Sequence, residues 1–322
     1  GGGLAKKRVM SYGDYPDDTY TGISNGDYHK KCIVRSNGVV ENFALGVDKA
    51  TFIPLEGKDF MDPQYLSEEV DHSWFAYPDG TSTLHPLDGV TDPKFTGPKS
   101  GTKEKWEYLD EDKKYSWIKS PTFKGKTAEV GPLAKYIVVY TKVKQGIITD
   151  PTWAESMMVR QIDTVSQVLG VPAHVWMTTM VGRTACRGLD AQVASNISQY
   201  FFDKLVANIK NGDTTVADTS KFEPNKWPKD AKGVGLVEAP RGGLGHWIHI
   251  KDGRSANYQC IVPSTWNACP KTAANEHGAY EDSMIDTHVK IADKPLEILK
   301  VIHSFDPCLA CATHLYNKKG EK

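Results

Sequence analysis

The sequence is poor in cysteine, in long apolar runs and in net charge. Six cysteines are spread over 322 residues, too few for the disulfide framework of a small secreted domain. The formal net charge is -1, so no broad basic field points to nucleic acid, and we expect no nucleic-acid partner. The longest strongly apolar run, 136–140, is far too short to span a bilayer. What remains is the composition of an ordinary globular protein, 39% apolar and 25% charged.

The chain opens with GGGLAKKRVMSYGDYP. This stretch has no initiator methionine and no apolar core segment of a signal peptide. We therefore expect a fragment that begins inside a longer protein. Export would then depend on a partner or on a segment that precedes residue 1.

Residues 1–150 are rich in glycine, proline, aspartate and aromatic residues in short segments. Residues 32–41 are typical of a hairpin, with Asn37-Gly38 as a tight turn. Residues 71–99 are dense in turn formers and predict loops. We expect this part to form a layer of hairpins and loops.

Residues 151–212 carry helical patterns. Asp150-Pro151 is a typical helix start, and Gly170 is a typical stop. A longer helix is expected from about 184 to 211, ended by Gly212. Its apolar residues recur every four positions, and Cys186 lies beside them: Leu189, Val193, Ile197, Phe201, Leu205 and Ile209. Such a stripe predicts helices in a bundle core.

The last third of the chain mixes strands and helices. After a polar loop over 213–235, two strands are expected at 244–250 and 255–262, joined by Asp252-Gly253. Part of 277–303 should be helical. The expected fold class is α+β, with a long-helix bundle core, peripheral short β-hairpins and extensive loops.

The stretch DPCLACATH at 306–314 places Cys308, Cys311 and His314 close together. A C-x-x-C pair can grip one metal, form a redox disulfide or be structurally inert. The added histidine favours a metal, and two thiolates favour nickel, zinc, an iron-sulfur cluster or copper(I). The residues alone leave these possibilities open.

The flanking sequence carries a resemblance. DPCxxCxxH, EAPRG (238–242) and NYQCIVPSTWN (257–267) together resemble the C-terminal part of the large subunit of nickel-iron hydrogenases. Further matches occur in the same order along nearly the whole chain: SYGDYP (11–16), SWIKSP to GPLA (116–134), GRTACR (182–187), GAYED (278–282) and KPLEIL to DPC (294–308).

The resemblance implies part of the hydrogenase large-subunit fold, with 1–322 as the C-terminal portion of one large catalytic domain. Residues 1–150 would form the layer and 151–212 the bundle helices. The active-site hairpin, helix and motif would span 236–314. Residues 315–322 resemble the start of a cleavable tail, with His314 and Leu315 flanking the processing site.

The resemblance also implies a nickel-iron centre whose iron carries cyanide and carbon monoxide. Cys308 would be a terminal nickel ligand, and Cys311 would bridge nickel and iron. The family draws two more thiolates from an R-x-C-G-x-C motif that this sequence lacks. A magnesium ion or second iron would be bound by His314 and by the backbone carbonyl of Cys260.

Four residues are implied to line the cyanide and carbon monoxide pocket: Pro240, Arg241, Pro263 and Ser264. Asp306 would pair with the arginine region in the outer shell. Arg241, Cys308 and Asp306 are therefore the expected catalytic residues, with either Arg241 or Cys308 as the base.

The implied function is the reversible oxidation of H2 to protons and electrons by heterolytic cleavage. An iron-sulfur small subunit is the implied electron-transfer partner. A maturation endopeptidase and metal-insertion proteins would act on the precursor. The location would be periplasmic or membrane-associated through the small subunit. The alternatives are a non-catalytic relative and a structural zinc-binding module built on the C-x-x-C pair.

Overall fold

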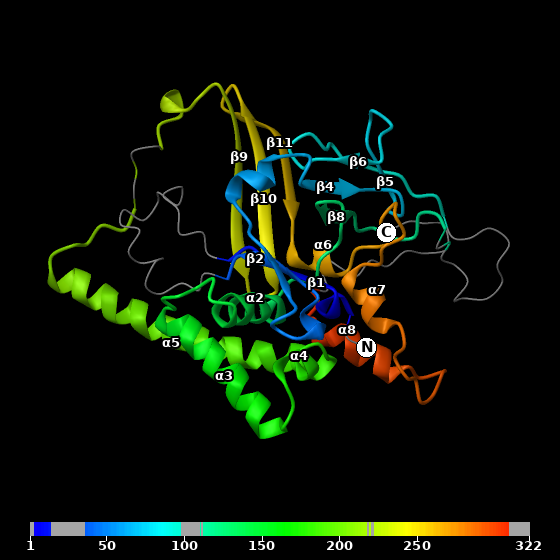
Figure 1. Ribbon diagram of the computed structural model, residues 1–322. Coiled ribbons are helices and arrows are strands. Elements are labelled where there is room, and N and C mark those ends of the chain that lie inside the picture. The colour runs from blue at the N-terminus through cyan, green and yellow to red at the C-terminus, as the bar shows by residue number, and fades with distance from the viewer. Residues whose placement is uncertain are drawn as a thin grey trace.

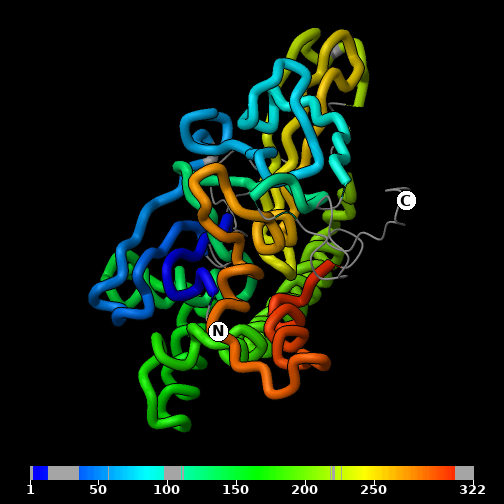
Figure 2. The backbone as a smooth tube through the Cα atoms, turned by 90° about the vertical axis from the view of Figure 1, so that its right-hand side faces the viewer, coloured from blue at the N-terminus to red at the C-terminus, as the bar shows by residue number. Residues whose placement is uncertain are grey.

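The computed structural model describes residues 3–13, 36–97, 110, 112–217, 219 and 222–308. A tall three-stranded sheet stands over a layer of helices, and shorter strands lie beside it (Figure 1). The hairpin end of the sheet points away from the helices in both views (Figures 1 and 2). Within the described residues, no helix combines the length and apolarity needed to cross a membrane.

The first 130 residues contribute short strands in three small sheets. β1 (Arg8–Ser11), β2 (Gly38–Glu41) and β3 (Thr51–Ile53) are antiparallel neighbours in that order. β4 (Leu66–Glu69) lies between β6 (Thr83–Leu84) and β8 (Ser120–Phe123), and β5 (Phe75–Ala76) pairs with β7 (Asp92–Pro93). Short 3-10 turns are η1 (Gly3–Lys6), η2 (Phe43–Leu45) and η3 (Gly57–Met61). The first arm of the hairpin expected at 32–41 lies mostly outside the described residues.

The helical layer consists of α2 (Pro132–Lys144), α3 (Trp153–Leu169), α4 (Ala173–Trp176) and α5 (Met180–Lys210). The start of α3 falls two residues later than the sequence predicts. Thr152 is its cap: the hydroxyl accepts from the Glu155 amide at 3.3 Å, and the Glu155 carboxylate accepts from the Thr152 amide at 2.7 Å. This reciprocal pair satisfies two backbone donors, which the single cap expected at Asp150 could not do.

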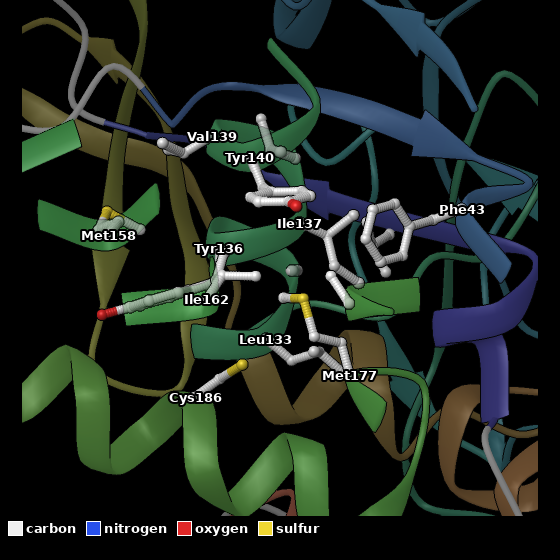
Figure 3. Packing of buried hydrophobic residues seen from close by; sticks show 14 of the residues in the cluster. Phe43, Leu133, Tyr136, Ile137, Val139, Tyr140, Met158, Ile162, Met177 and Cys186 are labelled. Carbon is white, nitrogen blue, oxygen red and sulfur yellow. The ribbon is translucent and has the colours of Figure 1, made fainter. Parts of the chain in front are cut away.

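The main core forms around α2, which the sequence did not predict. Side chains from every side of α2 are buried, and Cys186 of α5 and Met177 point toward it (Figure 3). A helix buried all round has no one-sided apolar period, so the run 136–140 gave no helical signal.

The bundle prediction is only partly matched by α3 and α5. Met158 and Ile162 of α3 are fully buried, as are Cys186 and Val193 of α5. The C-terminal half of α5 extends beyond the body (Figure 1), and Leu205 and Ile209 are 56% and 54% exposed. The mixed α+β class is confirmed, whereas a long-helix bundle core is not.

The tall sheet is β9 (Asp230–Ala239), β10 (Gly242–Lys251) and β11 (Arg254–Ile261), in the order β11-β10-β9. The Asp252-Gly253 hairpin is confirmed. The first part of β9, as far as residue 235, was expected to be loop because the segment 213–235 is polar and contains Pro224 and Pro228. The strand is formed although Gly233 and Gly235 weaken its pattern. One face of the sheet buries Leu236, Trp247 and Ile261 in a second core.

Three short α-helices follow the tall sheet: α6 (Pro263–Asn267), α7 (Ala279–Met284) and α8 (Leu296–Ser304). The 3-10 turn η5 (Pro224–Lys226) precedes β9. α8 packs against both α7 and α5 (Figures 1 and 2). The segment after α8 therefore lies where the helices meet the lower end of the sheet.

Candidate active site around Arg241 and Cys308

Arg241 lies in the tight connection between β9 and β10. Gly242 has φ 126°, and a Cβ there would lie 2.6 Å from the Gly131 amide nitrogen. Gly131 has φ 127°, and a Cβ there would lie 3.2 Å from the Arg241 carbonyl oxygen. Both positions favour glycine through backbone conformation and close approach. The two glycines let the turn rest on the start of α2, which fixes the backbone from which Arg241 extends.

The Arg241 guanidinium meets Asp306, which follows α8. Arg241 Nε donates to the Asp306 carbonyl oxygen at 2.8 Å and lies 3.2 Å from Asp306 Oδ2. Arg241 Nη2 is 3.4 Å from Oδ1. The side chains are 43% and 40% exposed, so the pair contributes about 0–1 kcal/mol to stability. Its main consequence is the orientation of the guanidinium.

Cys308 is tied to α6. Pro263 and Ser264 open this helix and are both buried, and Ser264 Oγ accepts from the Cys308 amide at 3.2 Å. The Cys308 side chain is half-buried. Tyr280 of α7 lies nearby, where burial and then the Asp306 carboxylate raise the pKa of its phenol. One thiol, one hydroxyl and one phenol thus gather beside the arginine–aspartate pair.

The structure brings together four of the expected site residues in two contacts, Arg241 with Asp306 and Ser264 with Cys308. Pro240 directly precedes Arg241 in the sequence, and Pro263 directly precedes Ser264. Three expected residues lie outside the described residues: Cys311, His314 and Leu315. The arrangement offers a soft ligand next to a fixed cation, which suits a thiolate-bound metal with anionic ligands.

Cys260 is exposed on β11, opposite His246 of β10. Partial desolvation of the thiol and then Glu68 raise its pKa, while Lys119 lowers it. Glu68 is 1% exposed and paired with Lys119, yet its Oε1 has no hydrogen-bond partner among the described residues. A carboxylate oxygen and a backbone carbonyl are suitable ligands for magnesium. No group of three or more histidine, cysteine or acidic residues in the described part forms a complete metal site.

Two arginines of α5 were missed as site residues. Arg183 Nη1 donates to Ser304 Oγ at 3.0 Å, and Arg187 Nη1 donates to the Ser304 carbonyl oxygen at 2.9 Å. The available signal was their four-residue spacing in GRTACR, which places both on one helix face.

Glu238 and Tyr12 were also missed. Glu238 Oε2 accepts from Ser11 Oγ and the Tyr12 amide, both at 2.9 Å, and from the Gly13 amide at 3.4 Å. Burial raises the pKa of Glu238 to about 7. Tyr12 Oη accepts from Trp266 Nε1 at 2.9 Å. The strand before Arg241 and the helix that carries Ser264 are therefore joined through one tyrosine.

The chain matches the family described as nickel-dependent hydrogenase over residues 1–314. It is 44% identical over 324 residues to the uptake hydrogenase large subunit of Rhizobium leguminosarum bv. viciae. It is 42% identical over 323 residues to the hydrogenase-1 large chain of Escherichia coli strain K12. Each alignment covers 100% of this chain and 50% of the relative, so the chain spans about half the length of the curated relatives it matches.

Solved structures give the same fold. The reduced, active form of the Ni-Fe-Se hydrogenase from Desulfomicrobium baculatum aligns with a TM-score of 0.61 at 23% identity, over 96% of this chain and 52% of that one. The reduced Ni-Fe-Se hydrogenase from D. vulgaris Hildenborough also gives a TM-score of 0.61 at 23% identity, over 97% and 53%. At this identity the likeness establishes the fold alone.

Proposed function

Because the chain belongs to the nickel-dependent hydrogenase family, we propose that it is the C-terminal portion of the large catalytic subunit of a nickel-iron hydrogenase. The activity would be the reversible oxidation of H2 to protons and electrons. The observation that carries this proposal is the convergence of Arg241, Ser264, Asp306 and Cys308 from three separate segments.

The described residues fit one side of a nickel-iron centre. Cys308 would be the terminal nickel ligand and Cys311 the bridge to iron. Arg241 and Ser264 supply N–H and O–H donors for cyanide nitrogen. Pro240 and Pro263 would line the same pocket without adding competing donors at their own backbone nitrogens.

When bound, the nickel-iron centre would supply the Lewis acid at which H2 is split heterolytically. Arg241 has Nε and Nη2 directed at Asp306, so its remaining N–H groups serve as donors into the pocket. Cys308 is then the proposed proton acceptor, as a thiolate beside the reacting atoms. Arg241 is the alternative base, and Asp306 holds it in place in either case.

A second metal, magnesium or iron, would be bound by His314 and the Cys260 carbonyl. The buried Glu68 Oε1, which has no partner among the described residues, supports a cation on this side of β11. Glu68 could meet such an ion directly or through its bound water.

The relatives are named large subunit or large chain, which supports an iron-sulfur small subunit as the partner. A maturation endopeptidase cutting between His314 and Leu315, metal-insertion proteins, and a periplasmic or membrane-associated location through the small subunit belong to the same proposal. The proposal also divides the chain into four parts: a layer of hairpins and loops (1–150), bundle helices (151–212), an active-site segment (236–314) and a tail (315–322).

The test uses the full-length protein that contains this chain, purified with its small subunit. We expect nickel, iron and H2 oxidation in the wild type. Cys308→Ser should lose nickel and activity, whereas Cys269→Ser, at a buried cysteine whose thiol donates to the Trp266 carbonyl oxygen, should keep both. Arg241→Lys should keep nickel and lose activity roughly 100-fold, the scale for one preorganised donor. Zinc without nickel in the wild type would instead favour the structural zinc module.

A further inference from the structure

The two arginines of α5 have different surroundings. Arg183 is buried and forms an ion pair with Glu129, with Nε 2.6 Å from Oε1. Its guanidinium also lies 3.8 Å from the ring centroid of Phe305. Through these contacts Arg183 links α5 to the end of α8, which is a structural role.

Arg187 lies one helical turn later, and its one acidic partner among the described residues is Asp306, beyond the end of α8. Its Nη1 donates to the Ser304 carbonyl oxygen at 2.9 Å. Its Nε is buried and has no hydrogen-bond partner among the described residues. That nitrogen lies 3.8 Å from Asp306 Oδ2, so its charge faces the carboxylate that Arg241 also uses.

Asp306 thus lies between two guanidinium groups that come from different elements. Oδ2 is 3.2 Å from Arg241 Nε and 3.8 Å from Arg187 Nε. With one cation, the exposed carboxylate could rotate away from Arg241, and the guanidinium would then be held only by the bond from Nε to the Asp306 carbonyl oxygen. A second cation on the helix side restricts that rotation. The Ser304 contact holds Arg187 itself, and burial lowers its pKa while Asp306 opposes the change.

We propose that Arg187 is a positioning residue for Arg241, acting through the Asp306 carboxylate. The inference rests on the proposed function, because Arg241 needs a fixed position only if it faces a bound metal group. Misplacing a reacting group by about 1 Å can cost roughly 100-fold in rate. Arg187 would prevent such a displacement without contacting the substrate or the metal.

The first experiment uses the purified complex of full-length large chain and small subunit. Arg187→Gln is expected to keep its nickel, to shift the infrared cyanide bands in the same direction as Arg241→Lys, and to lower kcat about 10-fold to 100-fold with little change in KM. Arg187→Lys should fall between wild type and Arg187→Gln, since lysine keeps the charge but not the planar fork. Arg254→Gln, at the exposed first residue of β11, is the matched control.

The double variant separates positioning from general damage. If Arg187 acts only through Arg241, Arg187→Gln combined with Arg241→Lys should be no slower than Arg241→Lys alone. Rate losses that multiply would overturn the proposal. So would wild-type cyanide bands and wild-type kcat per nickel in Arg187→Gln, or a loss confined to nickel content.

A second measurement does not depend on the metal. In the metal-free full-length chain, thermal unfolding of Arg187→Gln, Asp306→Asn and the double variant forms a cycle. Because Arg187 also binds the Ser304 carbonyl and Asp306 also pairs with Arg241, we expect the double variant to lose less in Tm than the sum of the two single losses. Losses that add in full would overturn the contact. A wild-type complex without nickel or cyanide bands would refute the proposed function, and this cycle would still report on the Arg187–Asp306 contact.

Discussion

Glu238 gives a prediction whose size follows from the structure. Its pKa is raised by burial to about 7, from an ordinary value of 4.5. The folded protein therefore keeps a proton that the unfolded chain releases between these pH values. The contribution of Glu238 to stability should be highest below pH 4.5, fall as pH rises to 7, and stay constant above. At ~1.4 kcal/mol per unit of pKa, the total loss is about 3.5 kcal/mol.

The perturbation is Glu238→Gln, which removes the ionisation and keeps the side-chain shape. The assay is urea-induced unfolding of wild type and variant at several pH values from 5 to 8. Because the unfolded glutamate is already mostly ionised at pH 5, we expect the wild type to lose about 2.5 kcal/mol more than the variant across this range. Glu223→Gln, at an exposed glutamate before η5, should follow the wild-type curve. Parallel curves for wild type and Glu238→Gln would refute the reasoning.

Two further predictions concern buried groups. Arg183→Met should destabilise the protein by about 3–5 kcal/mol in urea unfolding, because it leaves Glu129 buried without its counter-ion; a loss below about 1 kcal/mol would contradict the buried pair. Iodoacetamide at pH 8 should label the exposed Cys260 and spare Cys186 and Cys269, which are fully buried with thiol pKa values raised by burial. The native protein is labelled, and mass spectrometry then identifies the labelled cysteines. Labelling of Cys186 as fast as Cys260 would refute the assigned burial.

The sequence predicted those elements whose signals are local. Asp252-Gly253 predicted its hairpin because a tight turn needs two residues that tolerate positive φ, and Gly170 predicted the end of α3 because it takes a left-handed φ of 66°. α2 was missed because it is buried on all sides, a property set by its neighbours. The exposed half of α5 was overpredicted as core for the converse reason: an apolar stripe shows that a helix can pack, and the partner decides whether it does.

The site residues also fall into those that the sequence predicted and those that depend on tertiary packing. Motif resemblance named Arg241, Asp306, Ser264 and Cys308 as candidates, and the structure places them in two adjoining contacts. The spacing in GRTACR places Arg187 on one helix face with Arg183 but does not name its partner, because its contact with Asp306 depends on how α5 packs against α8. Tertiary packing supplies that information, since the two residues are more than a hundred positions apart.

The most direct test of the central claim is metal analysis and infrared spectroscopy of the purified complex of full-length large chain and small subunit. The account predicts stoichiometric nickel, iron, and absorption bands of both cyanide and carbon monoxide, with nickel and bands lost together in Cys308→Ser. Zinc in place of nickel, with neither type of band in the wild-type complex, would contradict it.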